Sequence, residues 1–277
     1  MTGLRPYISS LLLRMPAPLG SLRRVPVLGQ LIHRLSHFIL PADQLVWAQV
    51  RSGPARGLWI EVHPRTGQSY LAGDAELDTQ SVLAERLQPG DVFYDLGANI
   101  GLFSLLAARC VGDSGRVFSF EPDAVNAERL RRNAKRNSFS QITVIESGVW
   151  SSTGAMDFSI ADQASPDRGV GSFLSGSGGS VSVRVRVIAL DDFVRNAPLP
   201  HAIKCDVEGA EIHVLRGAEH LLALHRPWFL GEMHSEANDR ASRELLLHYG
   251  YTVETIGSNH LLALPSQSDL ITGESTN

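Results

Sequence analysis

Apolar and polar positions follow a repeating pattern from Asp91 onward, in which a short apolar run is followed by a longer segment of helical periodicity. The apolar runs are rich in Val, Ile and Phe, which is typical of buried strands. Because helical segments separate these runs, we predict an α/β fold with a mostly parallel sheet and helices on both faces. Five strands are expected here, at 92–97, 116–122, 142–147, 202–206 and 227–234. A single long helix is expected over 210–225.

The segments that flank this repeat predict antiparallel strands. Residues 45–53 and 57–64 meet at a glycine-containing turn and predict a hairpin, and a helix at 79–88 follows it. At the other end of the chain, residues 251–257 and 260–265 predict a closing antiparallel pair.

A Gly/Ser-rich segment at 161–180 interrupts the α/β pattern between two strand-like segments, 154–160 and 181–190. Its composition allows two interpretations, a surface loop or a lid over a substrate site.

The charge distribution divides the chain of 277 residues into two parts. Acidic residues are almost absent before Asp43, so we expect a basic, partly helical extension at 1–42 and an α/β domain at 43–277. The net charge of −4 is that of the whole chain and combines a basic extension with a clearly acidic body, and the acidic body argues against a nucleic-acid-binding function. The extension either lies on a membrane surface, covers an acceptor pocket or forms a dimer arm. Its prolines would break a long helix and favour the last two roles.

The cysteines and the hydropathy of the chain indicate in which cellular compartment the protein works. Cys110 and Cys205 both lie in apolar surroundings, and no Cys/His spacing indicates a zinc site. Free buried thiols are typical of a reducing compartment. No apolar run approaches the roughly 20 residues that a membrane span requires, so we predict a cytoplasmic protein.

A carboxylate stands at the end of each of the five predicted strands. In an open α/β sheet, ligands bind beyond the carboxyl ends of the strands, so these side chains are expected to meet around a ligand. The residues are Asp95, Glu121, Glu146, Asp206 and Glu232.

The first two strand ends indicate what that ligand is. Gly97 and Gly101 leave the backbone open to a ligand, while Asp95 beside them favours a cationic or hydroxyl-bearing group over a pyrophosphate. Glu121, one βα unit later, is placed to accept the hydroxyl groups of a ribose. The G-x-G-x-x-G dinucleotide pattern fails because Asn99 occupies its second glycine position. The pattern therefore predicts a positively charged nucleoside without phosphate, such as S-adenosylmethionine.

Three blocks of the sequence resemble the FkbM family of S-adenosylmethionine-dependent methyltransferases: "DVFYDLGANIGLFSLLAA", "VFSFEPD" and above all "AIKCDVEGAEIHVLRGAE". The resemblance covers about residues 80 to 235, and the segment from Lys204 to Glu211 is its most specific part. One departure, Ala189 where the family usually has Thr, concerns packing more than chemistry.

This resemblance implies a class I methyltransferase Rossmann-like fold with a seven-stranded sheet, and methyl transfer to a hydroxyl of a sugar or polyketide-like acceptor. It also implies a methionine-side pocket in the loop after the first strand, ribose contacts at the second strand end and an adenine edge at the third. The residues carried over are Asp95, Gly97, Ala98, Asn99 and Gly101, then Glu121 and Pro122, then Glu146 and Ser147.

Lys204 and Asp206 are the strongest catalytic candidates in the sequence. Side chains alternate along a strand, so these two lie on one face, and Glu232 and His234 share a face in the same way. A hydroxyl acceptor needs a base, for which Asp206 is the first choice and His234 the second. Lys204 would either orient Asp206 or lower the pKa of the acceptor hydroxyl. A structural ion pair between Lys204 and Asp206 is the alternative.

Several functions remain open at this point. Asp206, Glu232 and His234 could also hold Mg²⁺ that binds an acceptor diol, although no metal is required. The main prediction is an O-methyltransferase for a sugar, a glycosylated natural product or a surface glycan. N-methylation of an amino sugar or peptide amine, and a non-catalytic Rossmann-like binding module, are the alternatives.

Overall fold

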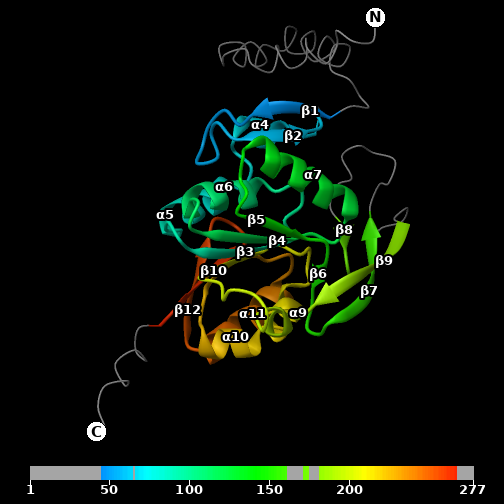
Figure 1. Ribbon diagram of the computed structural model, residues 1–277. Helices are drawn as coiled ribbons and strands as arrows, with labels where there is room; N and C mark the ends of the chain where they lie inside the picture. The colour runs from blue at the N-terminus through cyan, green and yellow to red at the C-terminus, as the bar shows by residue number, and fades with distance from the viewer. Residues whose placement is uncertain (1–44, 65, 161–170, 175–180, 267–277) are drawn as a thin grey trace, which may run out of the picture.

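The computed structural model describes residues 45–266 except for 65, 161–170 and 175–180, so the predicted extension at 1–42 lies outside the described residues. Its central element is a seven-stranded sheet (Figure 1). The strands are β3 (Val92–Leu96), β4 (Arg116–Phe120), β5 (Ile142–Ile145), β10 (Ala202–Cys205), β11 (Trp228–Glu232), β12 (Tyr251–Ile256) and β13 (His260–Pro265).

The order of these strands is β12-β13-β11-β10-β3-β4-β5. Parallel pairing joins β5, β4, β3, β10 and β11, whereas β13 is antiparallel to both of its neighbours. The predicted mostly parallel, seven-stranded Rossmann-like sheet and its closing antiparallel pair are therefore confirmed. Because β3, β4, β10 and β11 run in the same direction, their carboxyl ends meet at one edge of the sheet.

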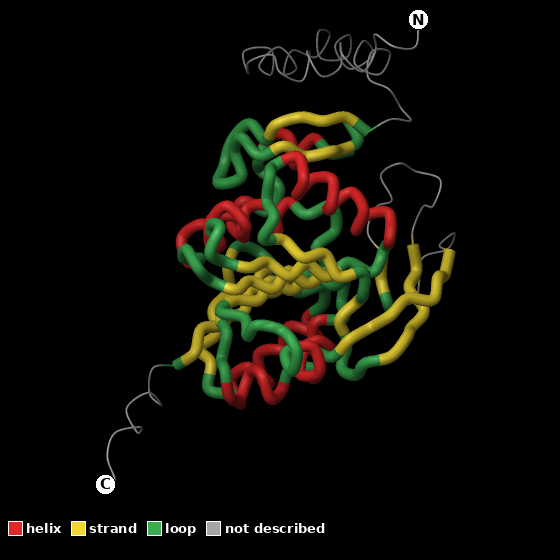
Figure 2. The backbone as a smooth tube through the Cα atoms, viewed as in Figure 1, coloured by secondary structure: helices red, strands yellow, loops and turns green. Residues whose placement is uncertain are grey.

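Helices cover both faces of this sheet (Figures 1 and 2). One face carries α5 (Leu77–Arg86), α6 (Leu102–Val111) and α7 (Ala124–Arg136), and the other carries α9 (Glu211–Arg216), α10 (Glu219–Leu224) and α11 (Glu236–His248). Each layer buries its own hydrophobic cluster against the sheet. None of the helices in the described part combines the length and the apolar character that crossing a membrane requires.

Local sequence signals explain where two of the helices begin. The Asp123 side chain accepts hydrogen bonds from the backbone N–H groups of Val125 and Asn126 and so caps α7. Ser235 caps α11 in the same way by accepting from the N–H of Asn238.

The N-terminal hairpin forms as predicted and packs on α7. Strands β1 (Val46–Gln49) and β2 (Trp59–Val62) pair antiparallel, and α4 (Gln68–Ala72) follows them. The backbone N–H of Glu61 donates to the Asn133 side chain at 2.8 Å, which fixes β2 against α7.

A second sheet of four strands was not predicted from the sequence. It consists of β6 (Gly148–Val149), β7 (Gly154–Ile160), β8 (Gly171–Ser172) and β9 (Val181–Ile188), in the order β6-β9-β7-β8. The strand character of β7 and β9 was expected, but the position of β8 within the predicted loop was not. The remainder of that loop, 161–170 and 175–180, lies outside the described residues.

The prediction of one helix over 210–225 was wrong, because the chain forms α9 and α10 with a break at Gly217. A Cβ atom at Gly217 would lie 2.2 Å from the backbone oxygen of Trp150, so only glycine permits this approach. The Gly217 carbonyl accepts a hydrogen bond from the N–H of Asp191, which lies in the short helix α8 (Leu190–Phe193). Contacts of Gly217 with Trp150, the residue after β6, and with α8 therefore account for the break.

Gly97 joins the ends of β3 and β10. Its φ of 77° is in the left-handed region, and an added Cβ would lie 1.8 Å from the backbone oxygen of Asp206. Glycine at this position therefore sets the distance between two of the strand ends that carry acids.

We predict that Gly97→Ala lowers the free energy of unfolding much more than Gly112→Ala. Both glycines have positive φ, so both substitutions incur strain of more than about 1 kcal/mol. Only the Gly97 variant adds a clash, since nothing lies within 4 Å of a Cβ at Gly112. Urea unfolding of both variants measures the difference, and equal losses would contradict the close approach described here.

Candidate active site

A cleft lies at the carboxyl ends of the parallel strands. It is lined by Gly97 after β3, Glu121 after β4, Asp206 after β10 and Glu232 at the end of β11. The cleft is thus at the place where an open α/β sheet binds its ligands, and three of the five predicted strand-end acids line it.

The second sheet adds an aromatic surface to the cleft. Phe158 and Phe173 line the cleft with their ring centroids 4.8 Å apart. Gly148 and Gly171 leave room for the two rings, because a Cβ on either glycine would lie 2.3 Å from a ring atom. Aromatic side chains of this kind suit a flat or apolar part of a ligand.

Glu121 presents a carboxylate whose geometry is fixed by the backbone. One oxygen accepts from the N–H of Asn99 and the other from the N–H of Asp123, both at 2.8 Å. A carboxylate oxygen has two acceptor positions, so each oxygen keeps one for a ligand. Two neighbouring hydroxyl groups, such as those of a ribose, match this arrangement. Burial raises the pKa of Glu121 to about 8, although the two backbone hydrogen bonds act to lower it.

Asp95 lies beneath the cleft and is not one of its lining residues. It is fully buried in β3, and its Oδ2 accepts a hydrogen bond from the Ser104 hydroxyl. Its Oδ1 has no hydrogen-bond partner among the described residues. Burial raises the pKa of this carboxyl above its usual value. Direct contact between Asp95 and a ligand stays a prediction.

The loop after β3 holds four more of the predicted cofactor residues. Two of them line the cleft and two do not. Gly97 and Asn99 line the cleft, and the φ of Asn99 is 49°. The N–H of Ala98, by contrast, donates to the Phe120 carbonyl and holds the loop against β4. Gly101 serves helix packing, because a Cβ there would lie 2.6 Å from the Leu130 side chain.

Of the other cofactor residues predicted at the second and third strand ends, one lines the cleft and two do not. Pro122 lines the cleft beside Glu121. Glu146 forms an exposed ion pair with Arg131 at 3.3 Å, and Ser147 donates its hydroxyl to the carbonyls of Gly148 and Arg186. Neither of these two residues lines the cleft, so their predicted contact with an adenine edge stays untested.

Lys204 and Asp206 form a buried pair at the end of β10. The Lys204 ammonium lies 3.1 Å from Asp206 Oδ2 and 4.5 Å from the centre of the Phe103 ring. Burial acts to lower the pKa of Lys204, but the carboxylates of Asp206 and Asp95 outweigh it and raise the pKa above its usual value. Asp206 Oδ1 has no hydrogen-bond partner in the described part of the chain.

His234 faces this pair from the loop after β11. Its Nδ1 lies 2.9 Å from Glu211 Oε1, while its Nε2 lies 3.4 Å from Glu208 and 3.7 Å from Asp206 Oδ1. The hydrogen bond with Glu211 raises the pKa of His234 to about 9, although partial burial opposes this shift. At neutral pH the imidazole already carries a proton, which favours Asp206 over His234 as a base.

Glu211 does more than begin α9. It is fully buried, and the N–H of Gly209 donates to its carboxylate at 3.0 Å. The Asn238 amide forms a further hydrogen bond with it. Glu211 therefore orients His234 and holds the loop before α9 at the same time.

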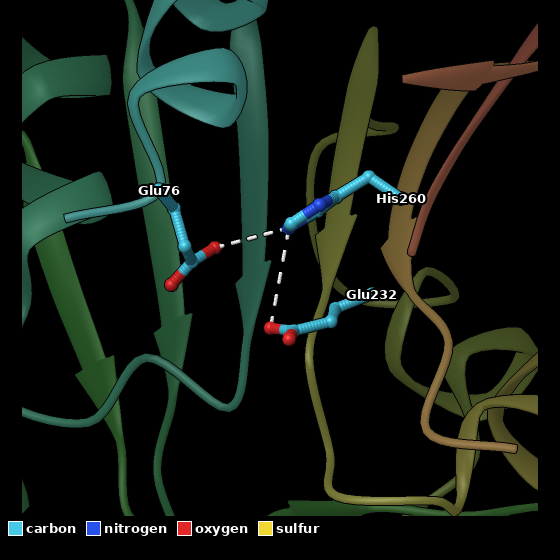
Figure 3. Close-up of side chains that lie close together, drawn as sticks. All are labelled: Glu76, Glu232 and His260. Atoms are coloured by element: carbon cyan, nitrogen blue, oxygen red, sulfur yellow. Dashed lines mark hydrogen bonds and ion pairs between the residues drawn. The ribbon is translucent and has the colours of Figure 1, made fainter. Parts of the chain in front are cut away.

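Sequence reasoning missed Glu76 and His260. Glu76 immediately precedes α5 and lines the cleft, and His260 is the first residue of β13. Figure 3 shows their side chains directed toward each other and toward Glu232. No local pattern marks either residue, because the three come together only through the order of the strands.

Three cleft residues have strained backbones. Glu76, Asn99 and Glu208 all line the cleft and have φ values of 43°, 49° and 55°. Such conformations are costly for residues other than glycine, and they cluster at functional sites.

Two sets of side chains in the described residues place possible metal ligands within 4.8 Å of one another. The sets are Asp206, Glu232 and His234, and Glu76, Glu232 and His260. The first set, predicted for Mg²⁺, fits that ion poorly, since imidazole is not a preferred ligand of Mg²⁺ and the pKa of His234 is raised to about 9. Ion pairs account for both sets without a metal.

S-adenosylmethionine fits the cleft by the chemistry of the residues present. Glu121 supplies paired acceptors for ribose hydroxyls, Phe158 and Phe173 supply an aromatic surface, and the carboxylates of Asp206 and Glu232 suit its positive charge.

The family model described as Methyltransferase FkbM domain matches residues 95–253 of the chain. Among curated relatives, hexuronic acid methyltransferase AglP of Haloferax volcanii is 31% identical over 149 residues, which cover 53% of this chain and 58% of that protein. The 31-O-demethyl-FK506 methyltransferase FkbM of Streptomyces tacrolimicus is 38% identical over 90 residues, covering 32% of this chain and 30% of that protein. The match thus spans less than two thirds of either relative. The crystal structure of methyltransferase FkbM from Methylobacillus flagellatus KT is similar with a TM-score of 0.49 and 22% identity, covering 64% of this chain and 44% of that one.

Glu121→Gln is expected to weaken binding of S-adenosylhomocysteine by at least about tenfold, because the amide NH2 group cannot accept from a ribose hydroxyl and would face a backbone N–H group that now donates to the carboxyl. Isothermal titration calorimetry measures the affinity, and circular dichroism checks the fold. Glu128→Gln is the matched control, because Glu128 is exposed, pairs with Arg131 on α7 and does not line the cleft. The same affinity in both variants would contradict a role for Glu121 in the cleft.

The raised pKa of His234 makes its stabilising contribution depend on pH. In the folded protein the pKa is about 9 and the ordinary value is 6.5, so the contribution is complete below about pH 6.5 and is lost as the pH rises through about 9. The stability difference between wild type and His234→Gln should therefore shrink over this range in urea unfolding experiments. A constant difference from pH 6 to pH 10 would show that His234 is not held as an imidazolium.

Proposed function

The chain belongs to the FkbM methyltransferase family, and from that premise we propose that it is an S-adenosylmethionine-dependent O-methyltransferase. The cleft at the carboxyl ends of the parallel strands supports this proposal, because open α/β sheets bind their ligands there. The acceptor we propose is a hydroxyl group of a sugar, a glycosylated natural product or a surface glycan. Two relatives support this class of acceptor, since one is named for a hexuronic acid and the other for 31-O-demethyl-FK506.

One observation carries the proposal: Glu121 and Asp206 line the same cleft although the chain places them on different βα units. The first is suited to hold a nucleoside through its ribose, and the second lies beside a buried cation. When bound, S-adenosylmethionine supplies an electrophilic methyl group. The protein then has to hold the acceptor oxygen in line and remove its proton.

Asp206 is the base in this proposal. Lys204 binds its Oδ2 at 3.1 Å and fixes the orientation of the carboxylate, which leaves Oδ1 without a hydrogen-bond partner among the described side chains. A hydroxyl group that donates to Oδ1 would satisfy this buried atom and pass its proton to it.

His234 assists without acting as the base. As an imidazolium it stands 3.7 Å from Asp206 Oδ1 and 3.4 Å from Glu208, so it offsets the repulsion between two neighbouring carboxylates. Glu211 keeps the ring in this position through the hydrogen bond at Nδ1.

An amine acceptor is the second candidate, and the charge of the cleft favours it. Asp206, Glu208 and Glu232 all line the cleft, and carboxylates stabilise an ammonium group. Transfer to an amine needs less basic assistance than transfer to a hydroxyl, so the two candidates differ in how far they depend on Asp206.

Asp206→Asn is expected to lower kcat for a hydroxyl acceptor by about 100-fold or more, the usual contribution of a general base. Transfer of labelled methyl from S-adenosylmethionine to a panel of glycosides and amino sugars measures the activity. Asp157→Asn is the control, since that carboxylate is exposed and pairs with Arg184 outside the cleft. Full activity of Asp206→Asn on a hydroxyl acceptor would contradict the proposed mechanism. Wild-type activity on amino sugars alone, with only a small loss of kcat in Asp206→Asn, would favour N-methylation.

A further inference from the structure

Glu76 enters the cleft from outside the Rossmann-like sheet. Among the described cleft carboxylates, it alone comes from the segment before β3. It occupies the N-cap position of α5 with a φ of 43°, yet its side chain makes no capping hydrogen bond. The strained backbone therefore serves to direct the carboxylate elsewhere, and its side chain lines the cleft.

The partners of Glu76 hold it in place and keep it ionised. His260 Nε2 lies 3.3 Å from Glu76 Oε2 and 4.0 Å from Glu232 Oε2, so the imidazole stands between the two carboxylates (Figure 3). Glu232 is fixed in turn by the Asn259 amide at 2.8 Å. Burial acts to raise the pKa of Glu76, but the hydrogen bond with His260 and the charge of Lys204 outweigh it and lower the pKa.

The two groups that lie near this carboxylate, the Lys204 ammonium and the His260 imidazole, are engaged elsewhere as well. The Lys204 ammonium makes its hydrogen bond to Asp206, and His260 is shared between Glu76 and Glu232. Carboxylates therefore outnumber cations in this part of the cleft, and a surplus of partly buried negative charge favours a positively charged ligand. Gly97 and Asn99, in the loop predicted to contact the methionine end of the cofactor, line the same cleft.

We propose that Glu76 binds the α-ammonium group of the methionine end of S-adenosylmethionine, with His260 and Glu232 as positioning residues. The inference rests on the proposed function. It adds a cofactor contact from Glu76, which precedes the residues 95–253 that the family model matches. It also gives the N-terminal hairpin and α5 a role in cofactor binding.

The test compares two nucleosides that differ at the relevant end. S-adenosylhomocysteine carries the amino acid group, whereas 5′-methylthioadenosine has a methyl group in its place. Isothermal titration calorimetry with wild type and Glu76→Gln should show S-adenosylhomocysteine weakened by about tenfold or more and 5′-methylthioadenosine changed by less than about twofold. Glu85→Gln, an exposed position on the same helix, is the control and should change neither affinity. His260→Gln should reduce the preference for S-adenosylhomocysteine in the same direction.

Each contrary result has a distinct meaning. Equal loss of both ligands in Glu76→Gln would show that Glu76 only shapes the cleft, and an unchanged affinity for S-adenosylhomocysteine would show that it binds no ammonium group; either overturns the inference while leaving the proposed function intact. Binding of Mn²⁺ to wild type that disappears in Glu76→Gln would assign this set of side chains to a metal and overturn it as well. Failure of wild type to bind either nucleoside would defeat the proposed function and this inference together.

Discussion

The ammonium group of Lys204 organises the candidate active site. Its side chain is 3% exposed and lies on the sheet in register with Asp95 of β3. A buried charge is costly unless it is paired, and here it is paired with Asp206 at 3.1 Å and covers the Phe103 ring at 4.5 Å. The positive charge of Lys204 offsets the repulsion between several carboxylates at one sheet edge. These carboxylates give the cleft its acidic character.

The backbone provides the second constraint. Gly97 lets the ends of β3 and β10 approach each other more closely than any side chain would permit. Backbone N–H groups of Asn99 and Asp123 hold Glu121. The strand ends are therefore preorganised, and the proposed cofactor would meet groups whose positions are already fixed.

Most of the sheet could be predicted from the sequence because each βα unit carries its own pattern of apolar runs and helical segments. The second sheet could not, since β7 and β9 pair across a segment whose composition indicates only a loop. The broken helix at Gly217 depends on the distant carbonyl of Trp150. In the site, Lys204 and Asp206 were found because alternation along one strand is a local rule, whereas Glu76 and His260 meet only through tertiary structure. Glu146 does not line the cleft, because a strand-end position does not decide whether a side chain turns inward or, as here, toward Arg131.

The account depends on a nucleoside with a charged amino acid end lying across the ends of β3, β4 and β10. A crystal structure of the full chain with S-adenosylhomocysteine tests this most directly. We expect the ribose hydroxyl groups within hydrogen-bond distance of Glu121 and the sulfur atom on the side of the cleft that holds Asp206. A ligand bound elsewhere, or a ribose turned away from Glu121, would contradict it.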